Sequence, residues 1–398
     1  DLSIDTNGNP EDSFDFGMGD QDYLVFMDDV NITTQDEAAV LENANNVSGL
    51  AVQEIYGKGD ADPSANIDVS LVDNDEIYFG TGGTVDLTNV SSSDLIGFFR
   101  EYIGFSTIAM AESEQTLNLE LFSDERDIAS VLLDVTGASA INIDSLVEEG
   151  ESQDNPNEID IFSETSAEIR VTGNQDLNLI TSTNVPDNEP GFVIDASDFE
   201  ANLTVMGTFG EDVIIGGSHN DTITGGVSDD MQTGGAGADT LTGGAGADRL
   251  TGGDGADTLT GNGGADVFSY AGTTAATLSA ETGLTTATAD IIDDFVTGTD
   301  QIDLAVAGTT GNFFALDTDT GATDQIGAVG DAVTAADAAT GAGTSFDGTV
   351  QYIHVFDSNS VNDGYLVADE DLDGAADYAI TLTGQASAGD LVFGDIVA

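Results

Sequence analysis

A nine-residue unit repeats seven times without a break between residues 207 and 269. The units read GTFGEDVII, GGSHNDTIT, GGVSDDMQT, GGAGADTLT, GGAGADRLT, GGDGADTLT and GNGGADVFS. A fixed short period is typical of solenoids, in which each repeat is one small structural unit that stacks on its neighbours. The repeat therefore constrains this part of the chain to a stack of short, equivalent units.

Two places in the unit keep their phase through the whole array. The sixth place is always aspartate: Asp212, Asp221, Asp230, Asp239, Asp248, Asp257 and Asp266. The eighth place holds Ile214, Ile223, Gln232, Leu241, Leu250, Leu259 and Phe268, so that only Gln232 breaks an apolar column. Glycine permits the positive-φ turn, and the residues around the eighth place alternate as a strand does, with the apolar side chain inward. The pattern predicts an all-β fold, a parallel β-roll or β-solenoid in which two units complete one coil.

The phase-locked aspartates are candidate metal ligands. With two units per coil, Asp212, Asp230, Asp248 and Asp266 line one edge of the roll, and Asp221, Asp239 and Asp257 line the other. Turn carbonyls would complete an oxygen-only ligand set suited to Ca²⁺. The glycines expected to supply them are Gly216, Gly225, Gly234, Gly243 and Gly252. We expect several calcium ions, and we expect substitution of Asp239 or Asp248 to lower calcium affinity more than substitution of Asp266 at the end of the stack.

Two alternatives compete with a calcium-binding roll. A flexible linker is suggested by the Gly-rich composition, but a linker requires neither a phase-locked aspartate nor a phase-locked aliphatic residue. A calcium-free solenoid would stack like charges, which repel one another unless a cation lies between them. The calcium-binding roll is therefore favoured.

The repeats resemble the calcium-binding nonapeptides of RTX, or hemolysin-type, proteins. The stretch after them, DIIDDFVTGTDQIDL at residues 290–304, resembles the segment that follows the calcium roll in serralysin-type proteins and helps to cap it. The ending GDLVFGDIVA resembles the C-terminal tails of type I export substrates. These resemblances imply a bacterial protein secreted by the type I route to the cell surface or the medium.

The charge balance limits the partners. The chain has 75 acidic against 5 basic residues, a formal net charge of -70. Nucleic acid is excluded because almost nothing neutralises phosphates, and anionic lipid is disfavoured for the same reason. There is no cysteine, so calcium rather than disulfides must brace the fold. No apolar run has the length of a membrane span, and no basic n-region or apolar h-region follows Asp1.

The rest of the chain is β-rich. Short alternating runs from NIDVSLV to NLTVMG predict strands, arranged as a sandwich or an irregular parallel solenoid, and the solenoid is favoured just before the repeats. Short helices are expected at residues 34–47, 94–103 and 330–339. We expect four regions: an N-terminal assembly or binding region (1–165), an irregular solenoid (166–206), the nonapeptide roll (207–269) and a C-terminal capping and secretion region (270–398).

A second calcium site is expected near the C-terminus. Four acids surround Gly374 in the sequence DEDLDGAAD: Asp369, Asp371, Asp373 and Asp377. Alternate acids that close on a glycine turn bring several oxygens together. A solvated acidic turn is the alternative, and the acidic DTNGNPED at residues 5–12 leaves the same two possibilities open.

The sequence gives no sign of a catalytic site. There is no H-E-x-x-H and no G-x-S-x-G, and the two histidines, His219 and His354, are too few for a three-histidine zinc site. A carboxylate pair for glycoside hydrolysis has no distinctive signal among so many acids. We therefore expect no enzyme activity, although a hydrolase whose site the sequence does not reveal is the least favoured alternative.

The N-terminal region decides between the remaining functions. IDASDFEANLTV at residues 194–205 leads into the repeats and resembles segments of calcium-dependent bacterial surface-layer proteins. We expect a secreted structural protein of a surface layer, matrix or filament that self-associates into sheets or filaments on calcium. The alternative is an adhesin or glycan-binding module displayed by the roll, with a cell-surface polysaccharide as its partner. Neither nucleic acid nor membrane insertion is expected.

Overall fold

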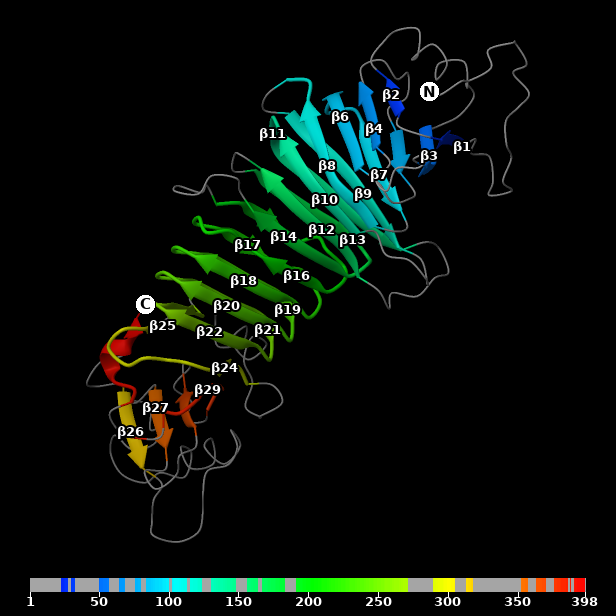
Figure 1. The fold of residues 1–398 in the computed structure, drawn as a ribbon. Helices are drawn as coiled ribbons and strands as arrows, with labels where there is room; N and C mark the ends of the chain where they lie inside the picture. Colours follow the sequence, from blue (N-terminus) through cyan, green and yellow to red (C-terminus); the bar gives the residue numbers. More distant parts are fainter. Residues whose placement is uncertain are drawn as a thin grey trace, which may run out of the picture. The chain divides into compact units, whose positions relative to one another are not determined.

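A computed structural model describes most of the chain from β1 to β30 (Figure 1). The described residues are 23–27, 30–32, 50–56, 64–68, 76–79, 84–99, 102–112, 115–123, 130–147, 156–163, 167–182, 191–270, 289–304, 313–317, 352–356, 363–369, 376–385, 387 and 390–397. The chain forms two compact units, Asp1–Thr208 and Phe209–Ala398. The predicted boundaries of the four regions stay a prediction.

Unit 1 is built from strands that alternate between two parallel sheets. One sheet has the order β1-β3-β5-β7-β9-β11-β13-β15, with bounds Tyr23–Met27, Leu50–Tyr56, Glu76–Phe79, Leu95–Phe99, Gln115–Ser123, Ala138–Val147, Glu168–Gly173 and Val193–Asp195. The other has the order β2-β4-β6-β8-β10-β12-β14-β16, with bounds Val30–Ile32, Ser64–Asp68, Thr84–Val90, Tyr102–Met110, Ser130–Thr136, Asn157–Ser163, Leu177–Ser182 and Leu203–Met206. The described strands of unit 1 thus form a parallel solenoid, one of the two architectures that the sequence left open.

The core of unit 1 lies between its two sheets. Strand β12 alternates strictly between buried and half-buried residues, because side chains along a strand point to opposite faces. Its inward residues Ile159 and Ile161 are fully buried, as are Ile141 and Ile143 of β11. In-register parallel pairing stacks apolar side chains of successive coils on one another, as with Ile141 of β11 and Ile169 of β13. Each coil therefore covers the apolar side chains of its neighbours.

The helix predicted at residues 94–103 is wrong. The segment forms β7 and the beginning of β8 instead, and β7 pairs in parallel with β5 and β9. Ile96 and Phe98 are both buried, and their spacing of two residues is that of a strand. The prediction relied on the helical spacing of the apolar residues in this segment, which the same residues also satisfy. Asp94 closes a turn rather than opening a helix, since its Oδ2 accepts from the Ser91 backbone N–H at 2.6 Å. The other two predicted helices, 34–47 and 330–339, lie outside the described residues.

Unit 2 contains the nonapeptides except the first two residues of the array, and its strands also alternate between two sheets. One sheet has the order β17-β19-β21-β23-β25-β30, with bounds Val213–Ile215, Met231–Gly237, Arg249–Gly255, Val267–Ser269, Gln301–Asp303 and Ile396–Val397. The other has the order β18-β20-β22-β24-β29-β28-β27-β26, with bounds Thr222–Val227, Thr240–Ala245, Thr258–Gly263, Ile291–Ile292, Tyr378–Leu382, Gly364–Ala368, Tyr352–Phe356 and Phe313–Asp317. Only β27–β28 and β28–β29 pair antiparallel among these. The predicted β-roll is confirmed.

Helical structure is scarce in the described residues. The 3₁₀ turn η2, Phe393–Asp395, is the helical element there. No helix in the described part of the chain is long and apolar enough to cross a membrane.

The apolar column of the repeats forms the core of the roll. Its six apolar members are fully buried, and so is Gln232, which pairs in register with Ile214 and Leu250. The Gln232 Nε2 atom donates to the Thr242 carbonyl at 2.9 Å, but the Gln232 Oε1 atom has no hydrogen-bond partner among the described residues. A buried amide oxygen without a donor costs free energy.

We therefore expect Gln232→Leu to stabilise unit 2. Filling the column with an aliphatic side chain removes the unsatisfied oxygen and should raise the free energy of unfolding by about 1 kcal/mol. Urea unfolding at fixed calcium, with Leu241→Gln as the reverse control, measures the change. A lower stability for Gln232→Leu would contradict this account of the column.

Candidate metal centre

The repeat aspartates form two continuous columns inside the roll. All seven are between 1% and 3% exposed. In each column, the backbone N–H of one aspartate donates to Oδ1 of the aspartate 18 residues later, as from Asp230 to Asp248 at 2.8 Å and from Asp239 to Asp257 at 2.8 Å. The same bond joins Asp212 to Asp230, Asp221 to Asp239 and Asp248 to Asp266. The structure thus places the aspartates along two edges in the predicted grouping.

In four of the repeat aspartates the second carboxylate oxygen has no donor among the residues that the structure describes. This holds for Oδ2 of Asp230, Asp239, Asp248 and Asp266. A buried ionised carboxylate is costly unless it is paired or coordinates a metal. These four oxygens therefore require a cation or a proton.

In the second to seventh units, the first glycine lies directly against the aspartate carboxylate of the same unit. A Cβ atom at Gly225, Gly234 or Gly243 would collide with Oδ2 of the aspartate five residues later. At Gly234 the same Cβ would also strike the carbonyl oxygen of Gly252. The predicted Gly216 and Gly252 have the same relation to Asp221 and Asp257. Glycine is needed because carboxylate and carbonyl oxygens converge on its Cα atom.

This arrangement fits calcium. The described residues contain no group of three or more His, Cys, Asp or Glu side chains placed to hold a metal. A cation beside one of these carboxylates would therefore be completed by backbone carbonyls such as that of Gly252. Calcium accepts such mixed oxygen sets with flexible geometry, whereas soft metals prefer sulfur or nitrogen.

Two members of the columns were missed by the sequence analysis. The backbone N–H of Asp257 donates to Oδ1 of Asp290 at 2.9 Å, and that of Asp266 donates to Oδ1 of Asp300 at 3.1 Å. Asp290 and Asp300 are 0% and 4% exposed. The signal was present, because each is followed two residues later by the buried Ile292 or Ile302, the same D-x-U spacing as in the repeats.

The expectation that Asp266 ends its column is wrong, because Asp300 adds one more coil beyond it. Asp300 itself differs from the inner members, since its Oδ2 accepts from the Val296 N–H at 2.7 Å. Asp221 is similar, because its Oδ2 accepts from the Gly217 N–H at 2.7 Å. At these two positions a backbone N–H group donates a hydrogen bond to Oδ2, which the Oδ2 atoms of Asp230, Asp239, Asp248 and Asp266 do not receive from the described residues.

Burial changes the acidity of the columns. Without a cation, burial raises the pKa of Asp230 to about 7 and that of Asp239 and Asp266 to about 6, against backbone hydrogen bonds that lower it. Burial likewise raises the pKa of Asp248 and Asp300. Protons and calcium therefore compete for the same oxygens near neutral pH.

This competition predicts opposite pH dependences with and without calcium. A carboxyl whose pKa is raised in the folded state retains a proton that the unfolded chain has lost, so metal-free stability is greatest below about pH 4 and falls as pH rises through 6 to 7. With millimolar calcium, protonation displaces the ion, and stability should rise between pH 5 and 7.5. Melting temperatures at both pH values, in metal-free and calcium buffers, test this. A melting temperature that changes with pH in the same direction in both buffers would contradict it. General charge repulsion weakens at low pH in both buffers, so it cannot by itself produce opposite changes.

The second predicted calcium site is only partly described. Strands β28 and β29 form an antiparallel hairpin, and the Asp377 N–H donates to the Ala368 carbonyl at 2.7 Å where the loop closes. Asp369 is fully buried after β28. Asp371 and Asp373 lie outside the described residues, as does the acidic segment 5–12. The site stays a prediction.

The two histidines lie in different surroundings. His354 is fully buried in β27, with Nε2 at 3.2 Å from the Gln385 carbonyl oxygen, and burial lowers its pKa to about 4. His219 is exposed in a repeat turn, beside the Ser218 hydroxyl. The expected absence of enzyme activity stays a prediction.

Comparison with known proteins supports the repeat assignment. A family model for the RTX calcium-binding nonapeptide repeat matches four copies at residues 204–231 and 233–268. A search of curated proteins finds no match to the chain. The resemblances to serralysin-type and surface-layer proteins stay predictions. The matched segments contain all seven repeat aspartates, so this part of the chain consists of RTX-type nonapeptide repeats, which bind several calcium ions.

Proposed function

We propose that the chain is a secreted structural protein of a cell surface or extracellular matrix, which folds and assembles when it meets calcium. The observation that carries this proposal is the set of four buried Oδ2 atoms that have no donor within the described part of the roll. Ligand that binds only the folded state stabilises it by RT ln(1 + [L]/Kd) per site. The roll should remain unfolded where free calcium is scarce and should fold where calcium is millimolar.

The location follows from the same linkage. RTX repeat proteins are typically exported by type I secretion and work outside the cell. A chain of charge -70 repels itself when compact, and calcium outside the cell relieves that repulsion in the columns. We therefore expect the chain to fold after export, where calcium is available.

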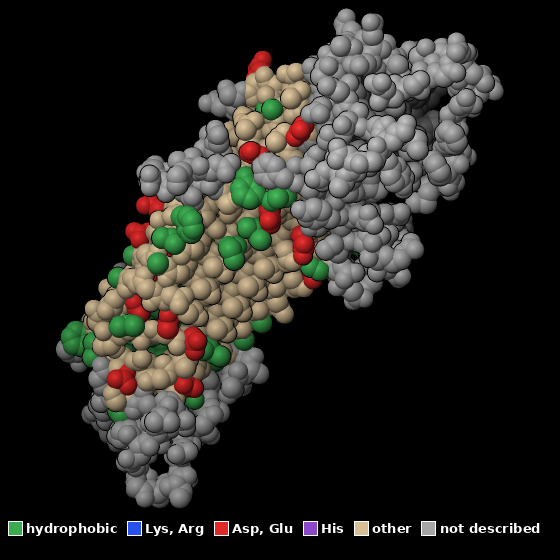
Figure 2. Space-filling view, viewed as in Figure 1, with side chains coloured by type: hydrophobic (Ala, Val, Ile, Leu, Met, Phe, Trp, Pro, Cys, Tyr) green, Lys and Arg blue, Asp and Glu red, His purple; other side chains and the backbone are tan. Residues whose placement is uncertain are grey.

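Assembly requires a second use of calcium. Figure 2 shows acidic side chains scattered over the described part of one face. Asp198, Glu200 and Glu211 are among the exposed acidic residues. Such surfaces repel one another over about 10 Å at 0.1 M salt. Calcium shared between acidic groups of neighbouring molecules would bridge them, whereas sodium would only screen them.

We expect calcium at millimolar concentration to convert monomers into large ordered sheets or filaments, and chelation to reverse the change. Light scattering with negative-stain imaging measures this, and sodium at matched ionic strength is the control. A folded protein that stays monomeric in calcium would overturn the structural role.

A further inference from the structure

The outer face of one sheet in unit 1 carries a hollow with a volume of about 350 Å³. Strands β9, β11 and β13 supply its polar lining: Asn118, Glu120, Asn142, Asp144, Arg170 and Thr172. Neither the repeats nor the assembly proposal gives these residues a role. The hollow is therefore a candidate binding site independent of the calcium columns.

Strand register arranges these side chains in two rows. Asn142 is paired with Asn118 on one side and with Arg170 on the other, which forms the first row. Asp144 is paired with Glu120 and Thr172 in the same way, which forms the second. Adjacent strands are about 4.8 Å apart, so a ligand lying across the strands meets a hydrogen-bonding group from each row at every coil.

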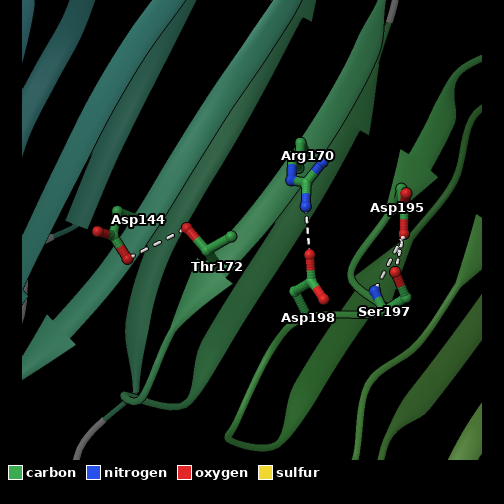
Figure 3. A network of polar contacts seen from close by, with 6 residues as sticks. All are labelled: Asp144, Arg170, Thr172, Asp195, Ser197 and Asp198. Carbon is green, nitrogen blue, oxygen red and sulfur yellow. Dashed lines mark hydrogen bonds and ion pairs between the residues drawn. The ribbon is translucent and has the colours of Figure 1, made fainter.

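Hydrogen bonds within the lining hold several of these side chains in place. Asn142 Nδ2 donates to Asn118 Oδ1 at 2.8 Å, and Asn118 Nδ2 donates to the Ser92 carbonyl at 3.0 Å. Figure 3 shows the Thr172 hydroxyl turned toward Asp144, to whose Oδ1 it donates at 3.2 Å. Within the described residues, Asn142 Oδ1 and Asp144 Oδ2 accept no hydrogen bond. Two fixed acceptors on one strand are thus available to a ligand.

The charge around the hollow excludes anions. Arg170 is already paired with Asp198, and Figure 3 shows its guanidinium turned toward that carboxylate. Glu120 and Asp144 then leave the lining with an excess of negative charge, on a chain whose net charge is -70. Acidic polysaccharides and phosphates would be repelled.

We infer that the hollow binds a neutral, hydroxyl-rich glycan that lies across β9, β11 and β13. Sugar hydroxyls donate to Asn142 Oδ1 and Asp144 Oδ2 and accept from the guanidinium N–H groups that Asp198 does not use. Ligand pockets span about 300 to 1,000 Å³, so the hollow takes one or two sugar rings of a longer chain. Leu95, Leu119 and Ile143 also line the hollow, so the apolar face of a sugar ring can pack there while its hydroxyl groups contact the polar side chains.

The test uses the full chain in millimolar calcium. Isothermal titration calorimetry with neutral oligosaccharides from dextran, a β-1,3-glucan and a galactomannan should detect binding to at least one, whereas oligogalacturonate should not bind. Asn142→Ala and Asp144→Asn should each weaken that binding about tenfold or more, as expected for loss of one hydrogen bond to a fixed acceptor. Circular dichroism and the calcium response of both variants should remain unchanged.

Asn178→Ala is the matched control, because Asn178 lies in β14 of the other sheet of unit 1. It should leave binding unchanged. Failure of every neutral oligosaccharide to bind, preference for oligogalacturonate, or equal weakening by Asn178→Ala would overturn the inference. The site needs no self-association, so a monomer that binds glycan would reject the assembly proposal and retain this one.

Discussion

Removal of calcium at pH 7 is expected to unfold the nonapeptide roll while unit 1 stays folded. Four inner carboxylates in the described roll have an oxygen without a protein donor. One bound ion at a hundredfold excess over Kd contributes about 2.7 kcal/mol, so four such sites would contribute about 11 kcal/mol. That is comparable with the whole stability of a typical domain, about 5 to 15 kcal/mol.

Hydrogen exchange in metal-free and calcium buffers would measure this loss by region. Amides of the repeat columns, such as those of Asp230 and Asp239, should lose protection without calcium. Amides of the unit 1 core around Ile159 and Ile161 should keep it, because apolar packing supports that solenoid. Equal protection of the roll in both buffers at pH 7 would show that calcium does not hold it together.

Substitution of an inner aspartate is expected to have the largest effect of any single mutation. Asp248→Ala removes the acceptor for the Asp230 N–H and the oxygen that lacks a donor. The loss of a hydrogen bond to a charged group and of one calcium site should together lower the free energy of unfolding in calcium buffer by about 3 to 5 kcal/mol. Asp266→Ala should cost as much, because the column continues beyond it to Asp300.

Two comparisons separate calcium binding from general stability. Asp254→Ala removes an exposed repeat aspartate outside the columns, so it should change neither stability nor calcium stoichiometry appreciably. Asp300→Ala should lower stability without removing a calcium site, because both its oxygens already accept from backbone N–H groups. Calcium titrations combined with urea unfolding give both quantities. Unchanged stoichiometry in Asp248→Ala would contradict its role as a ligand.

The sequence predicted the roll and its columns because each repeat carries its own signals. Asp239 and Leu241 recur at fixed places, and a repeating backbone turns equal spacing in sequence into stacking in space. Asp290 and Asp300 lie beyond the regular period, after a longer insertion. Their D-x-U spacing was visible, but which coil they join depends on strand pairing that local sequence does not specify.

Unit 1 shows where local patterns are insufficient. Its strands lack a fixed period, so parallel pairing such as that of β10 with β12 was not distinguishable from the pairing of a sandwich. Residues 94–103 fit both helical and strand spacing, and tertiary packing of Ile96 and Phe98 decided for strands. The hollow over β9, β11 and β13 likewise depends on register between coils, which brings together residues that are separated by more than 20 positions in the sequence.

A crystal structure of the calcium-loaded protein, with anomalous diffraction to locate the ions, would test the central claim most directly. The account predicts calcium about 2.3 to 2.6 Å from Oδ2 of Asp230, Asp239, Asp248 and Asp266, with turn carbonyls completing each site. Columns that remained without anomalous density, with these oxygens bonded to water or protons at neutral pH, would contradict it.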